Sequence, residues 1–135
     1  MKKILLINIF ALLFAFTASA QKVISASDAA KHLNEKVTIC EKVFSTKLIT
    51  PSNMTFLDLG GYHPNQLLTV VIKGEDRSKF KDAPDEYFKG RNVCVTGTVI
   101  DYKGKPEIVV SDPSQIKISL HDNIVPVPVE KKDRN

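Results

Sequence analysis

One stretch of the sequence, residues 90–116, constrains the fold more than any other part of the chain. It reads GRNVCVTGTVIDYKGKPEIVVSDPSQI. Valines alternate along a first predicted strand, 92–100, and a second strand follows over 107–111. Residues 102–106 supply the turn, because its glycine permits a positive φ and its proline can only open a strand. This β-hairpin indicates a protein built around a β-sheet.

The first twenty residues have the three parts of a secretory signal peptide. Two lysines give a positive start, an apolar run covers 4–16, and Ala18-Ser19-Ala20 is a small-x-small cleavage site. The apolar run is too short to span a bilayer. A buried N-terminal helix, the alternative, would not explain all three parts. We therefore expect 1–20 to be removed near Ala20 and the protein to be exported, periplasmic or secreted, with no stable membrane insertion.

Charge and residue spacing argue against several functions. The chain has 19 basic and 15 acidic residues, a net charge of +4, and loss of Lys2 and Lys3 lowers it to +2. That surplus is small for a non-specific duplex binder. His32, His63 and His121 are far apart in the sequence, and neither they nor the two cysteines have the spacing of metal ligands. The sequence also has no serine in a nucleophile elbow and no glycine-rich phosphate-binding loop. We predict no enzyme, no cofactor and no metal site.

The rest of the chain predicts three strands, a helical segment and then the hairpin. The ranges are a helix over 23–36, strands over 36–49, 55–59 and 67–73, a helical segment within 74–90, and a last extended piece over 114–119. The core candidates of the second strand are Phe56 with Leu57 or Leu59, depending on register. Residues 21–120 then form one domain, and 121–135 a poorly ordered, proline-rich tail.

Several motifs resemble a family of small secreted bacterial OB-fold domains, which occur free-standing or beside extracellular nucleases. They are KVTIC at 36–40, TFLDLG at 55–60, YHPNQ at 62–66 and VTGTVIDYKGKPEIVVSDPSQI at 95–116. The resemblance implies an all-β fold: a five-stranded Greek-key β-barrel with a short N-terminal helix and a helical segment between strands 3 and 4. A small mixed α+β sandwich is the alternative. Glu41 stands where relatives commonly have glycine, which leaves open where the first strand bends.

Within such a barrel the two cysteines are expected to form a disulfide. The first and fourth strands of an OB-fold are neighbours. If Val37 and Val93 face the core, Cys40 and Cys94 both face outward from those strands. An even cysteine count in an exported chain also favours a bridge. Two free, half-buried thiols are the alternative.

The resemblance also implies where a ligand would bind. OB-folds bind single-stranded nucleic acid or oligosaccharides across strands 2 and 3, between the loops joining strands 1–2 and 4–5. Aromatic rings and cations in that region suit single-stranded nucleic acid. The candidates are Phe44, Lys47 and Asn53 near the first loop, Tyr62 and His63 after the second strand, and Tyr102, Lys103 and Lys105 at the hairpin tip.

We predict a monomeric binding module for single-stranded nucleic acid, with weak affinity. The alternatives are a protein- or oligosaccharide-binding module of the cell envelope, or a structural or stress-related protein. For single residues, the alternatives are that Tyr102 covers the barrel end, that Phe44 belongs to the core, and that Lys103 and Lys105 are solubilising turn residues.

Overall fold

A computed structural model gives the structure of residues 22–120. The predicted signal peptide, 1–20, and the predicted tail, 121–135, lie outside the described residues. The strands are β1 (Val23–Ile24), β2 (Lys36–Ile49), β3 (Met54–Leu59), β4 (Leu68–Ile72), β5 (Asn92–Tyr102), β6 (Lys105–Val109) and β7 (Ile116–Ile118). The helices are short: η1 (Ala26–His32), α1 (Gly74–Arg77), α2 (Pro84–Tyr87) and η2 (Pro113–Gln115). The chain is therefore mostly β, which confirms the predicted class.

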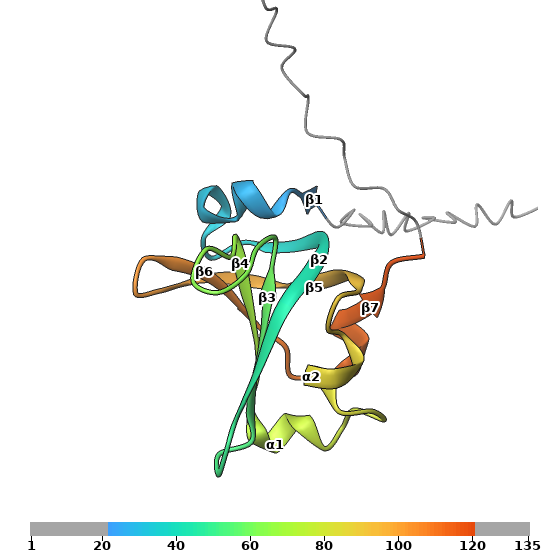
Figure 1. Cartoon of the computed structure of the whole chain (residues 1–135). Helices are drawn as coiled ribbons and strands as arrows, with labels where there is room; N and C mark the ends of the chain where they lie inside the picture. Colours follow the sequence, from blue (N-terminus) through green and yellow to red (C-terminus); the bar gives the residue numbers. More distant parts are fainter. Residues whose placement is uncertain (1–21, 121–135) are drawn as a thin grey trace, which may run out of the picture.

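The five long strands pair in an order that returns to its starting point. β2 pairs with β3, β3 with β4, β4 with β6, β6 with β5, and β5 again with β2. Only the β4–β6 pair of these five is parallel. β2 is long enough to pair with β5 through its first half and with β3 through its second half (Figure 1). The short strands β1 and β7 add to β2 and β5.

The core lies inside this ring of strands, because alternate side chains of each strand point inward. Val37, Ile39 and Val43 of β2 are fully buried. They pack with Leu57, Leu59, Leu68, Val70, Ile72, Val93, Val95, Val99 and Ile108 from the other strands. In β3 the register places Leu57 and Leu59 in the core, so the expectation of Phe56 as a core residue is wrong. Phe56 is half-buried and faces outward.

β2 bends at a β-bulge around Phe44. Val43 pairs with Leu59 and Ser45 pairs with the next residue, Asp58, so Phe44 is an extra residue on β2. The bend therefore lies three residues beyond Glu41, which keeps its regular pairing with Val93. The extra residue also reverses the alternation of β2. Val37, Ile39 and Val43 point inward before the bulge, whereas Lys47, at an odd-numbered position after it, is exposed.

Two local elements differ from the prediction. The N-terminal helix, η1, is a 3₁₀ helix that is shorter than the predicted 23–36 and follows the strand β1. The hairpin turn consists of Lys103 and Gly104 alone, with φ angles of 51° and 83°, so Tyr102 pairs directly with Lys105. Positive φ at both central residues gives a turn whose twist matches that of the strands. The first hairpin strand, β5, is consequently two residues longer than expected, and the second, β6, begins two residues earlier than expected at an unchanged length.

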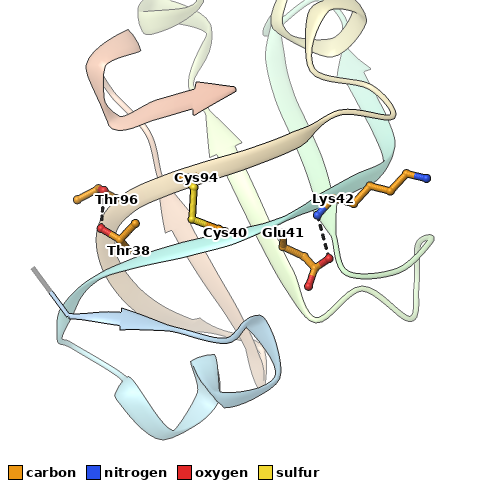
Figure 2. The surroundings of a disulfide bond; sticks show 6 residues. All are labelled: Thr38, Cys40, Glu41, Lys42, Cys94 and Thr96. Carbon is orange, nitrogen blue, oxygen red and sulfur yellow. Dashed lines mark hydrogen bonds between the residues drawn. A yellow bond between two sulfur atoms is a disulfide. The ribbon is translucent and has the colours of Figure 1, made fainter. Parts of the chain in front are cut away.

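The disulfide between Cys40 and Cys94 is present, as predicted. The two cysteines are direct partners in the antiparallel β2–β5 register, and their Cα atoms are 4.0 Å apart. Figure 2 shows the bond between the two strands, with Thr38 and Thr96 beside it, whose hydroxyl oxygens are 2.8 Å apart. The alternative of two free thiols is thereby excluded. Within residues 22–120, no helix has the length and apolar character needed to cross a membrane.

Candidate functional site

A groove of about 570 Å³ lies on the outer face of the sheet, between the second half of β2 and the β5–β6 hairpin. Five of the eight predicted site residues line it: Lys47, His63, Tyr102, Lys103 and Lys105. The other lining residues are Ser45, Thr46, Ile49, Phe56, Asp58, Gln66, Thr69 and Glu107. The structure thus brings together residues that are up to 62 positions apart in the chain, from Ser45 to Glu107.

Strand register arranges part of this surface in two rows. In the first row Lys47 of β2 pairs with Phe56 of β3, which pairs with Val71 of β4. In the second row, which runs from β2 to β6, the paired residues are Ser45, Asp58, Thr69 and Glu107. Side chains of paired residues lie on the same face of a sheet. The groove therefore has Lys47 and Phe56 in one row and a polar row beside it.

Lysines lie on both walls of the groove, and two of them lie beside the ring of Tyr102. Tyr102 is 55% exposed at the end of β5, and the Lys103 ammonium lies 5.4 Å from the centre of its ring. Lys105 Nζ donates a hydrogen bond of 2.9 Å to the carbonyl oxygen of Pro64. Across the groove, the Lys47 side chain makes no hydrogen bond or ion pair with any residue in 22–120. Its ammonium is therefore available to an anionic ligand.

Two carboxylates lie between these walls. Asp58 is only 5% exposed and accepts a hydrogen bond of 2.8 Å from Ser45 Oγ. Glu107 is half-buried, and its side chain has no hydrogen bond or ion pair with the described residues. Burial raises the pKa of the Glu107 carboxyl above its ordinary value of 4.5, because the charged form loses solvation. Glu107 therefore lowers stability when it is ionised.

Replacement of Glu107 by glutamine is expected to stabilise the protein slightly at neutral pH. The gain should be about 0.5 kcal/mol or less, because the side chain is partly exposed. The folded state binds the Glu107 proton more tightly than the unfolded state does. The gain should thus be complete above the raised pKa and disappear as the pH falls toward 4.5. Urea unfolding of both proteins across this pH range measures the difference, and a variant less stable at neutral pH would contradict it.

The remaining predicted site residues lie outside the groove lining. Phe44 and Tyr62 form an edge-to-face pair with ring centres 5.2 Å apart. The pair is close to the groove, since the backbone N–H of His63 donates to Ser45 Oγ at 3.2 Å. Asn53, with a φ of 56°, lies in the β2–β3 turn and lines a separate cavity of about 300 Å³ beside α1.

Sequence reasoning missed two residues that define the groove, Phe56 and Glu107. Phe56 alternates with the core residues Leu57 and Leu59, and this alternation could have placed it outward once the register was known. Glu107 lies on the same face as Lys105, which requires that β6 begin at the two-residue turn. Within residues 22–120, no group of three or more histidine, cysteine or carboxylate side chains could hold a metal ion.

Comparisons with known proteins give a likeness of fold only. No model of a protein family matches the chain, and no curated protein matches its sequence. Among solved structures, RecG bound to a three-way DNA junction is similar over 76% of this chain, with 22% identity and a TM-score of 0.50. A candidate aspartyl-tRNA synthetase from Leishmania major Friedlin is similar over 78%, with 16% identity and a TM-score of 0.47. The chain spans only 13% and 22% of those two proteins.

Proposed function

We propose that the protein is an OB-fold binding module that holds single-stranded nucleic acid in the groove. The fold assignment draws on the strand order. Three antiparallel-paired strands, β2 to β4, are followed by α1 and α2, and then by a hairpin whose strands pair back to β4 and β2. That order is the one expected of a five-stranded OB-type barrel. The likeness to a segment of RecG supports the fold and adds nothing about the ligand.

The observation that carries the proposal is the combination of Tyr102 and Phe56 with three lysines around one groove. Single strands expose their bases, which stack on aromatic side chains, while their phosphates attract cations along the groove. Lys47 lies on one wall, and Lys103 and Lys105 lie on the other. A single-stranded nucleic acid between these walls could place its bases on the rings of Tyr102 and Phe56 and its phosphates near the lysine ammonium groups. With so few cations, binding should be weak.

Binding of a fluorescent DNA strand about 12 nucleotides long tests the proposal by anisotropy. Three phosphate contacts predict a slope of about −2 for the logarithm of affinity against the logarithm of salt concentration. Affinity should then fall about 20-fold between about 50 and about 200 mM salt. A duplex of the same sequence should bind more weakly, because its bases are not available for stacking. Absence of binding at low salt, or a salt-independent affinity, would remove the proposal.

We also propose that the protein acts after export. Disulfides persist in oxidising compartments and are rare in the cytosol, so the Cys40–Cys94 bond supports this location together with the signal-like residues 1–20. Protein synthesised in bacteria with residues 1–20 is expected to be recovered outside the cytoplasm, beginning at Gln21 and without alkylatable thiols. Cell fractionation checks the location, and mass measurement after alkylation checks the first residue and the absence of free thiols. An uncleaved chain with two free thiols would contradict export.

A further inference from the structure

Three hydrogen-bond acceptors cross the centre of the groove. Asp58 of β3 and Glu107 of β6 are both partners of Thr69, on the strand between them. Neighbouring strands are about 4.8 Å apart, so the two carboxylates are attached to backbones about 10 Å apart. Between them, Gln66 Nε2 donates to Thr69 Oγ1 at 3.0 Å, while Gln66 Oε1 is buried and has no hydrogen-bond partner within residues 22–120. We call Asp58, Gln66 and Glu107 the acceptor row.

The acceptor row is unusual for a surface that binds an anionic polymer. Carboxylates there repel phosphates, and a buried acceptor without a donor lowers stability. Among residues 22–120, Glu107 has no ion pair that would account for its position. A ligand that carries N–H donors at the centre and phosphates at the margins would pair with Glu107, the accessible acceptor of the row, and with the lysines. Nucleobases with exocyclic amino groups have that chemistry, since carboxylates accept hydrogen bonds from cytosine N4 and similar donors.

We propose that the groove selects bases that carry an exocyclic amino group over uracil and thymine, and that Glu107 is a residue that determines this preference. The inference rests on the proposed binding of single strands. Stacking on Phe56 and Tyr102 does not distinguish bases of similar size. The 4-amino group of cytosine can donate to Glu107, whereas the 4-oxo group of uracil presents an oxygen to the same carboxylate. In that contact the Glu107 carboxylate and the 4-oxo oxygen of uracil are both acceptors without a donor, and the two oxygens repel each other.

Oligodeoxycytidine and oligodeoxyuridine of equal length form a matched pair of probes, because their bases differ only at the 3- and 4-positions. At neutral pH we expect the purified protein to bind the cytidine strand about tenfold more tightly, within the discrimination that one good base contact provides. In Glu107→Gln the side-chain amide can turn either its oxygen or its N–H₂ toward the base. The ratio of the two affinities should then fall to about twofold or less. Glu86→Gln removes an exposed carboxylate outside the groove lining and should leave the ratio unchanged.

The outcomes separate this inference from the function on which it rests. Equal affinity for the two strands, or a ratio that Glu107→Gln leaves unchanged, overturns the selectivity and leaves single-strand binding intact. Binding of neither strand overturns both. A ratio that falls in Glu107→Gln but not in Glu86→Gln supports the inference, provided that thermal unfolding shows both variants to be folded.

Discussion

Replacement of Cys40 and Cys94 by serine is expected to lower the free energy of unfolding by about 4 kcal/mol. The disulfide joins residues 54 positions apart, so it removes many conformations from the unfolded chain. It also ties β2 to β5, which together hold Val37, Ile39, Val93 and Val95 of the core. A loss of this size is a large part of the 5–15 kcal/mol that typically stabilises a domain. Urea unfolding of the two proteins measures this loss, and it is followed by circular dichroism because the chain has no tryptophan.

The reduced form of the unsubstituted protein is the control for this prediction. If the loss comes from the cross-link, reduction should lower stability by the same amount as the double serine substitution. A large difference between the two would indicate that the serine side chains themselves disturb the face shared by Thr38 and Thr96. A loss below about 1 kcal/mol in both would show that the paired strands hold together without the bond.

Replacement of both Phe56 and Tyr102 by alanine is expected to weaken single-strand binding about 30-fold or more. Each stacked base contributes about 1–3 kcal/mol, and the lower value for two rings gives this factor. The two side chains come from β3 and β5 and line the same groove, so their removal leaves the lysines without a stacking surface. Anisotropy at low salt measures the affinities of the double variant and of each single variant.

Tyr62→Ala is the matched comparison, because it removes a ring that is 66% exposed and does not line the groove. Its expected effect is a change of about twofold or less, since Tyr62 packs on Phe44 instead of facing the groove. An equal loss in Tyr62→Ala and in the double variant would move the stacking surface to the Phe44–Tyr62 pair. Thermal unfolding is needed beside the binding data, because Phe56 is half-buried and its truncation also affects packing.

Much of the fold could be predicted because strand alternation and turn residues are local signals. β2 has the predicted bounds, and β3, β4 and β5 begin within one residue of the predicted starts. The disulfide could be predicted because strand alternation places the side chains of Cys40 and Cys94 on the outer face of two strands expected to be neighbours. What could not be read locally is the register between strands, which depends on where an extra residue is inserted. The bulge at Phe44 is such an insertion, and it decides which side chains after it face outward.

The candidate site was predictable in part for the same reason. Tyr102, Lys103 and Lys105 belong to a hairpin tip that the sequence marks by its glycine, and all three line the groove. Phe56 and Glu107 could not be assigned to it, because each needs a pairing between strands that are distant in the sequence. Asn53 was grouped with the site through its loop, but the tight β2–β3 turn directs it to the cavity beside α1.

Nuclear magnetic resonance with ¹⁵N-labelled protein tests most directly whether the groove is where single strands bind. Titration with a short cytidine strand at low salt should shift the backbone amides of Lys47, Phe56 and the 102–107 segment most strongly. Amides on the face of the disulfide, such as those of Cys40 and Lys117, should change little, since neither residue lines the groove. Chemical-shift changes concentrated on the disulfide face, or no changes at any oligonucleotide concentration, would contradict the proposed binding site.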